Sequence, residues 1–364
     1  MIGRARFLSR VTGAALVAAA CAVVVVAQAP QADLVVRGAR VVDGTGAPWY
    51  VADVAVKGDT IVAIGRGLAL KGAREVDGAG LVLAPGFIDT HTHARRGIFD
   101  VPTADNYVRQ GVTTLFEGPD GSSPLPLGPF LDKVAAARVS VNFGAFVGQG
   151  SVRAQVMGEV DRPATADEVE RMRALVRAGM RDGAFGLSTG LFYVPGTFTP
   201  TAEVVELARV AGEMGGIHVS HMRDEASKVV DSVRETIAIG EKVYGRDTVF
   251  LAAGQEKLAE VLIAAGRPAE AEAILRRALK AWNNPLGPDH SASASVHAGL
   301  GATSLARGDA VAALESYRLA VRLLTGKREA QTLAGGERVH PADLWPVERR
   351  FHDPDVPVAA APLP

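Results

Sequence analysis

Two histidines one residue apart are the side chains best placed to do chemistry in this sequence. His91 and His93 end the segment APGFIDTHTH, which spans residues 84–93. Because side chains alternate between the two faces of a β-strand, residues two apart point the same way and can reach one common metal ion. The spacing therefore predicts a pair of metal ligands. The alternative is two solvated or hydrogen-bonded histidines on a sheet face.

Strands that alternate with helices must position this pair. Apolar runs predict strands at 87–91, 112–117, 139–147, 184–188 and 216–221. Helical patterns lie between them at 103–110, 166–182, 202–214 and 225–242. This alternation predicts βαβ units and a parallel sheet. In a closed barrel of such units the active site lies at the carboxyl ends of the strands, where we find His91, His93, Asp120 and His221.

The residues before the first of these strands form two segments. Arg4, Arg6 and Arg10 precede an uncharged apolar stretch at 11–27, and small residues follow it, which is typical of a secretory signal. We therefore expect a secreted or periplasmic protein, with an uncleaved membrane anchor as the alternative. Residues 33–83 alternate short β-branched runs with turn residues and predict a small antiparallel sheet.

The C-terminal third has a different pattern. From about residue 248 it is rich in alanine with helical periodicity, and residues 258–282 align with 300–324 at a shift of 42 positions. Each copy reads as two helices joined by a turn, at Gly266 or Gly308, so the region resembles tetratricopeptide repeats. The Pro- and Ala-rich end of the chain predicts an irregular or disordered tail.

The charge balance excludes one class of partner. The 364 residues contain 39 Lys and Arg against 40 Asp and Glu, which gives a formal net charge of −1. A protein that holds nucleic acid by its phosphates needs a field of basic side chains. We therefore expect no nucleic-acid partner.

Several motifs between about residues 33 and 243 resemble the metal-dependent amidohydrolases, and within them the D-aminoacylase or N-acyl-D-amino-acid deacylase group. They are PGFID before the histidine pair, QGVTT at 110–114, GLSTGL at 186–191 and SHMRDE at 220–225. The resemblance implies a TIM-type (β/α) barrel that carries a small β-sandwich and binds Zn²⁺ or another divalent metal at its mouth. Zinc lowers the pKa of bound water and polarises an amide carbonyl.

The resemblance also assigns metal ligands. His91 and His93 match the paired ligands of the first strand, and His221 matches the ligand after the fifth. Asp120 falls where relatives have a bridging cysteine, so a carboxylate oxygen would replace the thiolate. The alternatives are that Asp120 is an ordinary turn residue, or that Glu117 is the substitute ligand.

Two residues are candidates for binding the substrate's carboxylate. Tyr193 matches a tyrosine with this role in the family, although a tyrosine after a strand is often a packing residue. Arg223 could grip a carboxylate through two parallel hydrogen bonds, or pair with Asp224 or Glu225 instead. His218 stands three residues before His221 in the same strand, so we expect it to face the opposite side and to be structural.

The sequence departs from the family after Lys242. In the family a sixth strand ends in another metal-binding histidine, and an eighth ends in an aspartate that acts as general base and acid. Neither motif appears here, and the helical repeats begin where the sixth strand should be. The catalytic residues therefore stay unassigned. Five βα units also cannot close an eight-stranded barrel, so the break needs an explanation. We favour a gene-model or frameshift artefact over completion by another protomer or a real but inactive fusion.

The expected organisation has five parts. They are a signal peptide (1–32), a β-sandwich segment (33–83), a partial amidohydrolase barrel (84–243), tetratricopeptide-like repeats (248–325) and an irregular tail (326–364). The expected function is metal-dependent hydrolysis of the amide bond of N-acylated amino acids, with little or no activity in this chain. The alternative is a non-catalytic interaction protein that binds a protein or peptide at its repeats and keeps a vestigial barrel half.

Overall fold

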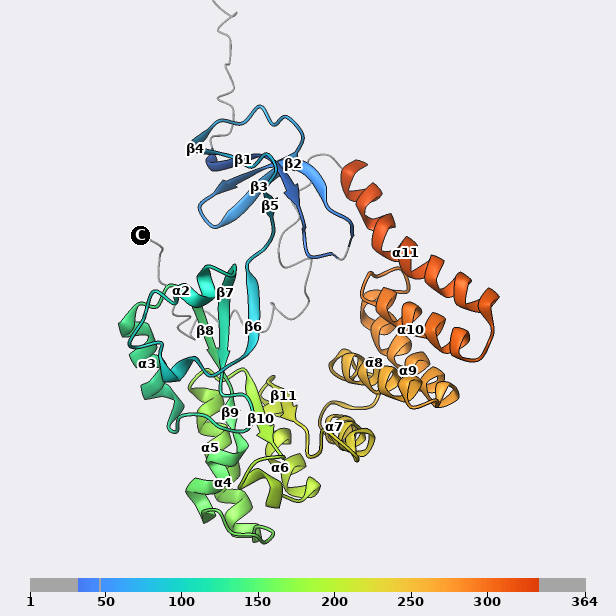
Figure 1. Ribbon diagram of the computed structural model, residues 1–364. Coiled ribbons are helices and arrows are strands. Elements are labelled where there is room, and N and C mark those ends of the chain that lie inside the picture. The colour runs from blue at the N-terminus through green and yellow to red at the C-terminus, as the bar shows by residue number, and fades with distance from the viewer. Residues whose placement is uncertain (1–31, 46, 334–364) are drawn as a thin grey trace, which may run out of the picture. The chain divides into compact units, whose positions relative to one another are not determined.

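The computed structural model describes residues 32–45 and 47–333, which form two compact units (Figure 1). The first unit comprises residues 32–42 and 49–83, and the second comprises residues 43–45, residues 47–48 and all described residues from Ala84 onward. Nearly all of the predicted signal segment, and residues 334–364 of the predicted tail, lie outside the described residues. Among the helices that are described, none is both long enough and apolar enough to cross a membrane.

The first unit is a five-stranded sheet with the order β3-β2-β1-β4 and with β5 also paired to β1. Its strands are β1 (Ala32–Val41), β2 (Tyr50–Lys57), β3 (Thr60–Gly65), β4 (Gly72–Asp77) and β5 (Val82–Leu83). Strands β1, β2 and β3 are antiparallel as expected. The expectation of an antiparallel sheet is wrong for β4 and β5, which run parallel to β1. The turn signals described hairpins, whereas β4 is reached from β3 by a connection that crosses to the far side of β1.

The second unit begins with a parallel sheet. Strands β6 (Phe87–Thr92), β7 (Val112–Glu117) and β8 (Asn142–Ala145) pair in that order, as do β9 (Val147–Gly148), β10 (Gly186–Gly190) and β11 (Ile217–His221). The predicted strand at 139–147 is split into β8 and β9 at Phe146. Phe146 donates its N–H to Glu117 O at 2.9 Å, and Phe185 N–H bonds Ala145 O at 2.9 Å. Hydrogen bonds therefore continue across the break, and the strands occupy five successive barrel positions.

Helices cover the outer face of this sheet. They are α3 (Leu127–Ala137), α4 (Gln149–Met157), α5 (Ala166–Arg181), α6 (Thr201–Glu213) and α7 (Val229–Tyr244), with a single turn, α2 (Asp105–Val108), before β7. Helix α5 starts with a capping box in which Thr165 and Glu168 satisfy each other's backbone N–H groups. The core between helices and sheet is aliphatic and includes Val147, Leu187 and Leu207, each with no exposed surface.

The repeat region consists of two helical hairpins. Helices α8 (Val249–Ala264) and α9 (Pro268–Leu286) form the first, and α10 (Ser293–Ala306) and α11 (Ala310–Leu333) form the second. The two inner turns lie at the equivalent glycines predicted from the repeat, Gly266 with φ +72° and Gly308 with φ +82°. Helix α11 continues to Leu333, so the expectation of an irregular chain from residue 326 is wrong for 326–333. Residues 327–331 favour a helix and outweigh the single Gly326.

Helix α7 belongs to two hydrophobic cores. Its Ile239 and Val243 pack in the core beneath the parallel sheet. Its Ile237, Val230 and Val233 pack instead with the buried residues of α8 and α9. After α7 the described chain continues directly into α8, without a sixth parallel strand. The sheet of the described residues is therefore open at both β6 and β11, and the predicted fold class, a partial barrel followed by an all-α repeat region, is confirmed.

Candidate metal centre

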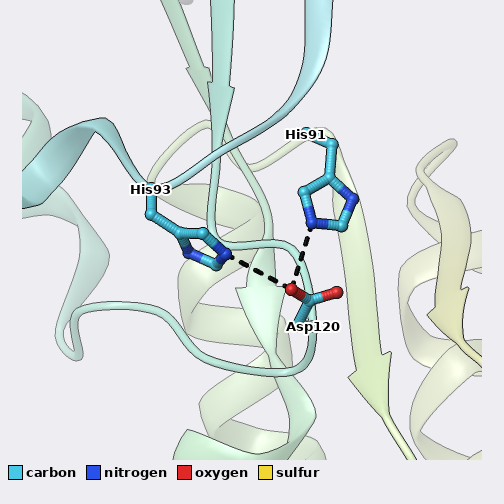
Figure 2. Close-up of side chains that lie close together, drawn as sticks. All are labelled: His91, His93 and Asp120. Atoms are coloured by element: carbon cyan, nitrogen blue, oxygen red, sulfur yellow. Dashed lines mark hydrogen bonds and ion pairs between the residues drawn. The ribbon is translucent and has the colours of Figure 1, made fainter.

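Three predicted ligands converge at the carboxyl ends of β6 and β7. Figure 2 shows the imidazoles of His91 and His93 turned toward the carboxylate of Asp120. The Nε2 atoms of His91 and His93 lie 3.0 Å and 3.3 Å from Asp120 Oδ2. One ligand atom from each residue lies within 4.8 Å of the other two, so a single ion between them would be in reach of all three.

The fourth predicted ligand meets the same carboxylate from the other side. His221, at the end of β11, places Nδ1 3.2 Å from Asp120 Oδ1. Asp120 thus offers one oxygen to the histidine pair of β6 and the other to His221. A carboxylate between two groups of imidazoles is an arrangement that suits one or two cations.

A tight turn aims Asp120 into the site. Asp120 has a φ of +58° and stands between Gly118 at +86° and Gly121 at +73°. Aspartate tolerates this left-handed conformation better than most residues because its short side chain bonds locally. The turn and ligand interpretations of Asp120 are therefore compatible, since the turn itself directs the carboxylate toward the histidines.

Long-range contacts hold this turn on both sides. Arg95 donates to the carbonyl oxygen of Ser122 at 2.9 Å and to its hydroxyl at 3.0 Å. From the neighbouring strand, the hydroxyl of Ser188 accepts from Gly121 N–H at 3.2 Å. A side chain at Gly190 would place its Cβ 2.0 Å from the carbonyl oxygen of Asp120. In the motif GLSTG of β10, Ser188 thus binds the turn through its hydroxyl, and Gly190 leaves room for the turn because it has no side chain.

Glu117, the weaker alternative ligand, lies outside the cluster. Its side chain is fully buried and forms an ion pair with Arg95. The same carboxylate accepts the N–H groups of Arg95, at 2.9 Å, and Gly118, at 2.8 Å. These contacts use both oxygens, so Glu117 supports the turn rather than the cluster.

Tyr193 lies beside the site. Its hydroxyl is 3.4 Å from His221 Nδ1, and the two ring centres are 4.7 Å apart. Partial desolvation, together with the nearby carboxylates of Asp120 and Glu225, raises the pKa of Tyr193. The hydroxyl is therefore protonated at neutral pH and available as a donor. Its role in substrate binding stays a prediction.

Arg223 is engaged in the protein itself. Its Nε and one terminal nitrogen donate to Glu235 at 3.0 and 2.9 Å, and its two terminal nitrogens also reach the carbonyls of Thr197 and Thr199 at 3.0 and 2.9 Å. Four of the five donor hydrogens of the guanidinium are thus used. Arg223 therefore does not present a free guanidinium to a substrate carboxylate, as one of the two predictions required. Its hydrogen bonds instead attach the segment after β11 to α7. The partner is Glu235 rather than Asp224 or Glu225.

His218 faces away from the cluster, as its spacing from His221 predicts. Its Nε2 lies 3.0 Å from the hydroxyl of Thr189. Burial lowers the pKa of His218 to about 4, so this ring is neutral at physiological pH. Sequence reasoning missed one contact: the carboxylate of Glu225 stands 3.0 Å from His221 Nε2. Its signal was present in the sequence as an acidic residue four positions after a predicted ligand.

The donor set fits a divalent cation. Neutral imidazole nitrogens with a carboxylate oxygen are typical zinc ligands. Three imidazoles face the oxygens of one carboxylate, His91 and His93 through Nε2 and His221 through Nδ1. A cation would bind the nitrogens that face Asp120 and hold the rings in orientation.

Comparison with known proteins shows what this part of the chain is similar to. It is 36% identical over 234 residues to D-aminoacylase from Alcaligenes xylosoxydans xylosoxydans, which covers 58% of this chain and 48% of the relative. The N-acyl-D-aspartate deacylase of the same organism is also 36% identical, over 237 residues and with the same coverage. This part of the chain is homologous to the D-aminoacylases. The chain spans about half the length of these relatives.

Solved structures agree with the sequence relatives. A crystal structure of D-aminoacylase matches with a TM-score of 0.57 and 33% identity, over 68% of this chain and 56% of that one. An N-acyl-D-glutamate deacylase from Bordetella bronchiseptica, complexed with zinc and a phosphonate inhibitor, matches with a TM-score of 0.55 and 34% identity, over 58% and 50%. The zinc in that relative agrees with the predicted divalent cofactor. Residues 250–325 match the tetratricopeptide repeat family, so the predicted resemblances are confirmed for both regions.

Proposed function

We propose that this chain is a divalent-metal protein of the N-acyl-D-amino-acid deacylase type, in which His91, His93, Asp120 and His221 hold the cation. The observation that carries the proposal is the carboxylate of Asp120, which meets His91 and His93 through one oxygen and His221 through the other. Homology to enzymes named as deacylases supports the same reaction class.

The proposed substrate is an N-acylated amino acid. A divalent ion held by these residues would supply an activated water and a Lewis acid for the amide carbonyl. Tyr193, which is 43% exposed, is placed to donate its hydroxyl to an anionic group of the substrate. Asp120 fixes the orientation of the imidazoles, and the turn that carries it is already held by Arg95 and Ser188.

We further propose that hydrolysis by this chain is weak or absent. Among the described residues, the chain after β11 forms α7 and then the repeats, and none of these residues forms a later strand that could deliver a general base to the barrel mouth. General acid–base catalysis contributes about 10²- to 10⁴-fold in rate. A chain that keeps the metal ligands and lacks this group would bind metal well and turn over slowly.

Zinc binding and deacylation, measured on the full chain, test both parts. We expect the parent protein to bind zinc and the His91→Ala variant to lose it, with His297→Ala, a histidine of the repeats, as the matched control. Release of amino acid from N-acetyl-D-amino acids should be slow. Robust turnover that His91→Ala abolishes would show that the site is complete. A parent protein that binds no zinc would refute the metal site.

A second function, binding of a peptide at the repeats, is favoured by one cavity. It measures about 650 Å³ and lies between α9, α10 and α11. Its lining includes three arginines and two glutamates, Arg276, Arg318, Arg322, Glu272 and Glu315. We expect an acidic peptide pool to bind more tightly than a basic pool, and Arg318→Glu to reverse that preference. Arg171→Glu on α5 is the control, and equal binding of both pools would reject this function.

Two further proposals concern the export of the protein and the origin of the sequence after Lys242. We propose that residues 1–32 direct export, which N-terminal sequencing of the protein recovered from culture medium or periplasm would test. The junction after Lys242 is tested by peptide mass spectrometry of the protein in its native cells. A peptide that spans residues 242–250 would eliminate the artefact explanation. Its absence, together with peptides from another reading frame, would support it.

A further inference from the structure

His221 has a carboxylate at each of its two ring nitrogens. Nδ1 lies 3.2 Å from Asp120 Oδ1, and Nε2 lies 3.0 Å from Glu225 Oε1. The His221 side chain is only 15% exposed. Its Nε2 is buried and forms no hydrogen bond of standard geometry, so Glu225 is the charged group that faces it.

The residues on either side fix where Glu225 stands. Arg223 binds Glu235 of α7 through two hydrogen bonds, at 2.9 and 3.0 Å. Asp224 Oδ1 accepts the N–H groups of Ala226 and Lys228, each at 2.9 Å. These contacts anchor the backbone of the segment between β11 and α7, so the main chain of Glu225 is held near His221.

We propose that Glu225 is a positioning residue for His221. With a cation at Nδ1, the proton of a neutral imidazole lies on Nε2, and the carboxylate of Glu225, 3.0 Å away, is the group near enough to accept it. Without a cation, Asp120 at Nδ1 and Glu225 at Nε2 compete for that proton. A histidine ligand that donates its other N–H to a carboxylate is held in one tautomer and one orientation, and it binds its metal more tightly. The inference rests on the proposed function, because it assigns Glu225 to the same metal centre.

The alternative is a surface ion pair. Glu225 is 56% exposed and stands four residues after His221, and exposed pairs of this kind contribute little to stability. The two interpretations differ in what they affect. A surface pair leaves metal affinity unchanged, whereas a positioning residue changes metal affinity and the tautomer of His221 without changing the fold.

Zinc affinity of the full chain, measured by competition with a chromophoric chelator, separates them. We expect Glu225→Ala to weaken binding by about 10- to 100-fold. Glu225→Gln should fall between this variant and the parent because its amide oxygen still accepts a hydrogen bond. Asp231→Ala removes an exposed carboxylate from the first turn of α7 and should leave zinc affinity unchanged. Equal affinities in the parent and Glu225→Ala would overturn the inference.

The tautomer of His221 gives a readout without metal. In the metal-free protein Asp120 faces Nδ1 and Glu225 faces Nε2, so nitrogen NMR of the imidazole should show a larger share of the Nε2-protonated tautomer in the parent than in Glu225→Ala. A parent that binds no zinc but shows this difference would refute the proposed function while leaving Glu225 as the group that orients His221. A parent that binds zinc and shows no tautomer change in Glu225→Ala would refute the role of Glu225 alone.

Discussion

The barrel half and the helical repeats are stabilised in different ways. In the barrel half, polar contacts join residues distant in sequence, such as Arg95 with Ser122, Gly121 with Ser188 and Asp120 with His221. In the repeats the ion pairs lie on helix surfaces, either within one helix, as between Arg276 and Glu272, or between neighbouring helices, as between Arg307 and Glu272. A metal centre needs ligands from several strands to meet at one point. Among the described residues, the strand ends of the barrel half bring His91, His93 and Asp120 together in this way, whereas the helix surfaces of the repeats carry paired charges.

The largest effect is expected from a substitution in the metal cluster of the barrel half. Asp120→Asn keeps the side-chain volume and tolerates the left-handed backbone, but it removes the negative charge that His91, His93 and His221 share. We expect zinc affinity to fall by more than the roughly 100-fold that loss of an outer-shell partner causes. Titration with zinc and circular dichroism check it. A variant with parental affinity and an unchanged fold would show that Asp120 is only a turn residue.

Removal of one arginine from each region should give very different losses of stability. Arg153 of α4 is fully buried and pairs with Glu203 of α6 at 2.5 Å. Arg153→Ala leaves that buried carboxylate unpaired, which costs about 3–5 kcal/mol. In the repeats, Arg276→Ala removes an exposed pair with Glu272 worth about 0.3–0.5 kcal/mol. Denaturant unfolding measures both. Similar losses in the two variants would contradict the contrast.

The pH dependence of stability compares one histidine from each region, His218 in the barrel half and His297 in the repeats. Burial lowers the pKa of His218 to about 4, whereas an unfolded histidine titrates near 6.5. The unfolded chain therefore takes up a proton first, and stability present above pH 6.5 decreases as pH falls toward 4, by up to about 3 kcal/mol. Burial also lowers the pKa of His297 in the repeats.

Unfolding measured between pH 7 and pH 4 tests this prediction. His218→Gln should flatten the curve because the titrating ring is gone, and His297→Gln should flatten it less. A parental slope in His218→Gln would show that other groups cause the acid sensitivity.

The smallest effects concern glycines. Gly254, inside α8, has room for a methyl group because its Cβ would lie 3.7 Å from Ile237. We expect Gly254→Ala to raise the free energy of unfolding by about 0.5–1 kcal/mol. Gly266→Ala should lower it by about 1–2 kcal/mol because of its positive φ. Thermal unfolding gives both signs, and stabilisation by Gly266→Ala would contradict the turn geometry. In the barrel half, Gly190 is required by contact with Asp120 rather than by its backbone angle.

The sequence predicted the parts of the fold that depend on local pattern. Strand β7 was predicted with its observed ends, and α5 within one residue, because apolar period and a capping box define them. Helices α3 and α4 were not predicted. The first has glycine and proline in its first turn, and the second has a glycine there and a weakly apolar sequence. Helix α7 begins four residues later than predicted, because Asp224 draws the preceding backbone into a turn.

For the site, the sequence predicted which residues lie together but not how their side chains are oriented. The order of parallel strands brings His91, His93 and His221 to one edge of the sheet, which the motifs anticipate. The sequence could not show that Arg223 turns to Glu235, since that contact depends on where α7 begins. Nor could it show which His221 nitrogen faces Asp120, because ring orientation is set by neighbours from other strands.

Helix α7 has a consequence for how such a chain arises. One set of its apolar side chains, Ile239 and Val243, completes the core of a βα unit, and another, Ile237, Val230 and Val233, completes the core of a helical hairpin. A helix with two such faces can join a (β/α) sheet to a helical repeat. If the two regions were joined by recombination after this helix, no additional linking element would be needed, because α7 packs both against the parallel sheet and against the first helical hairpin.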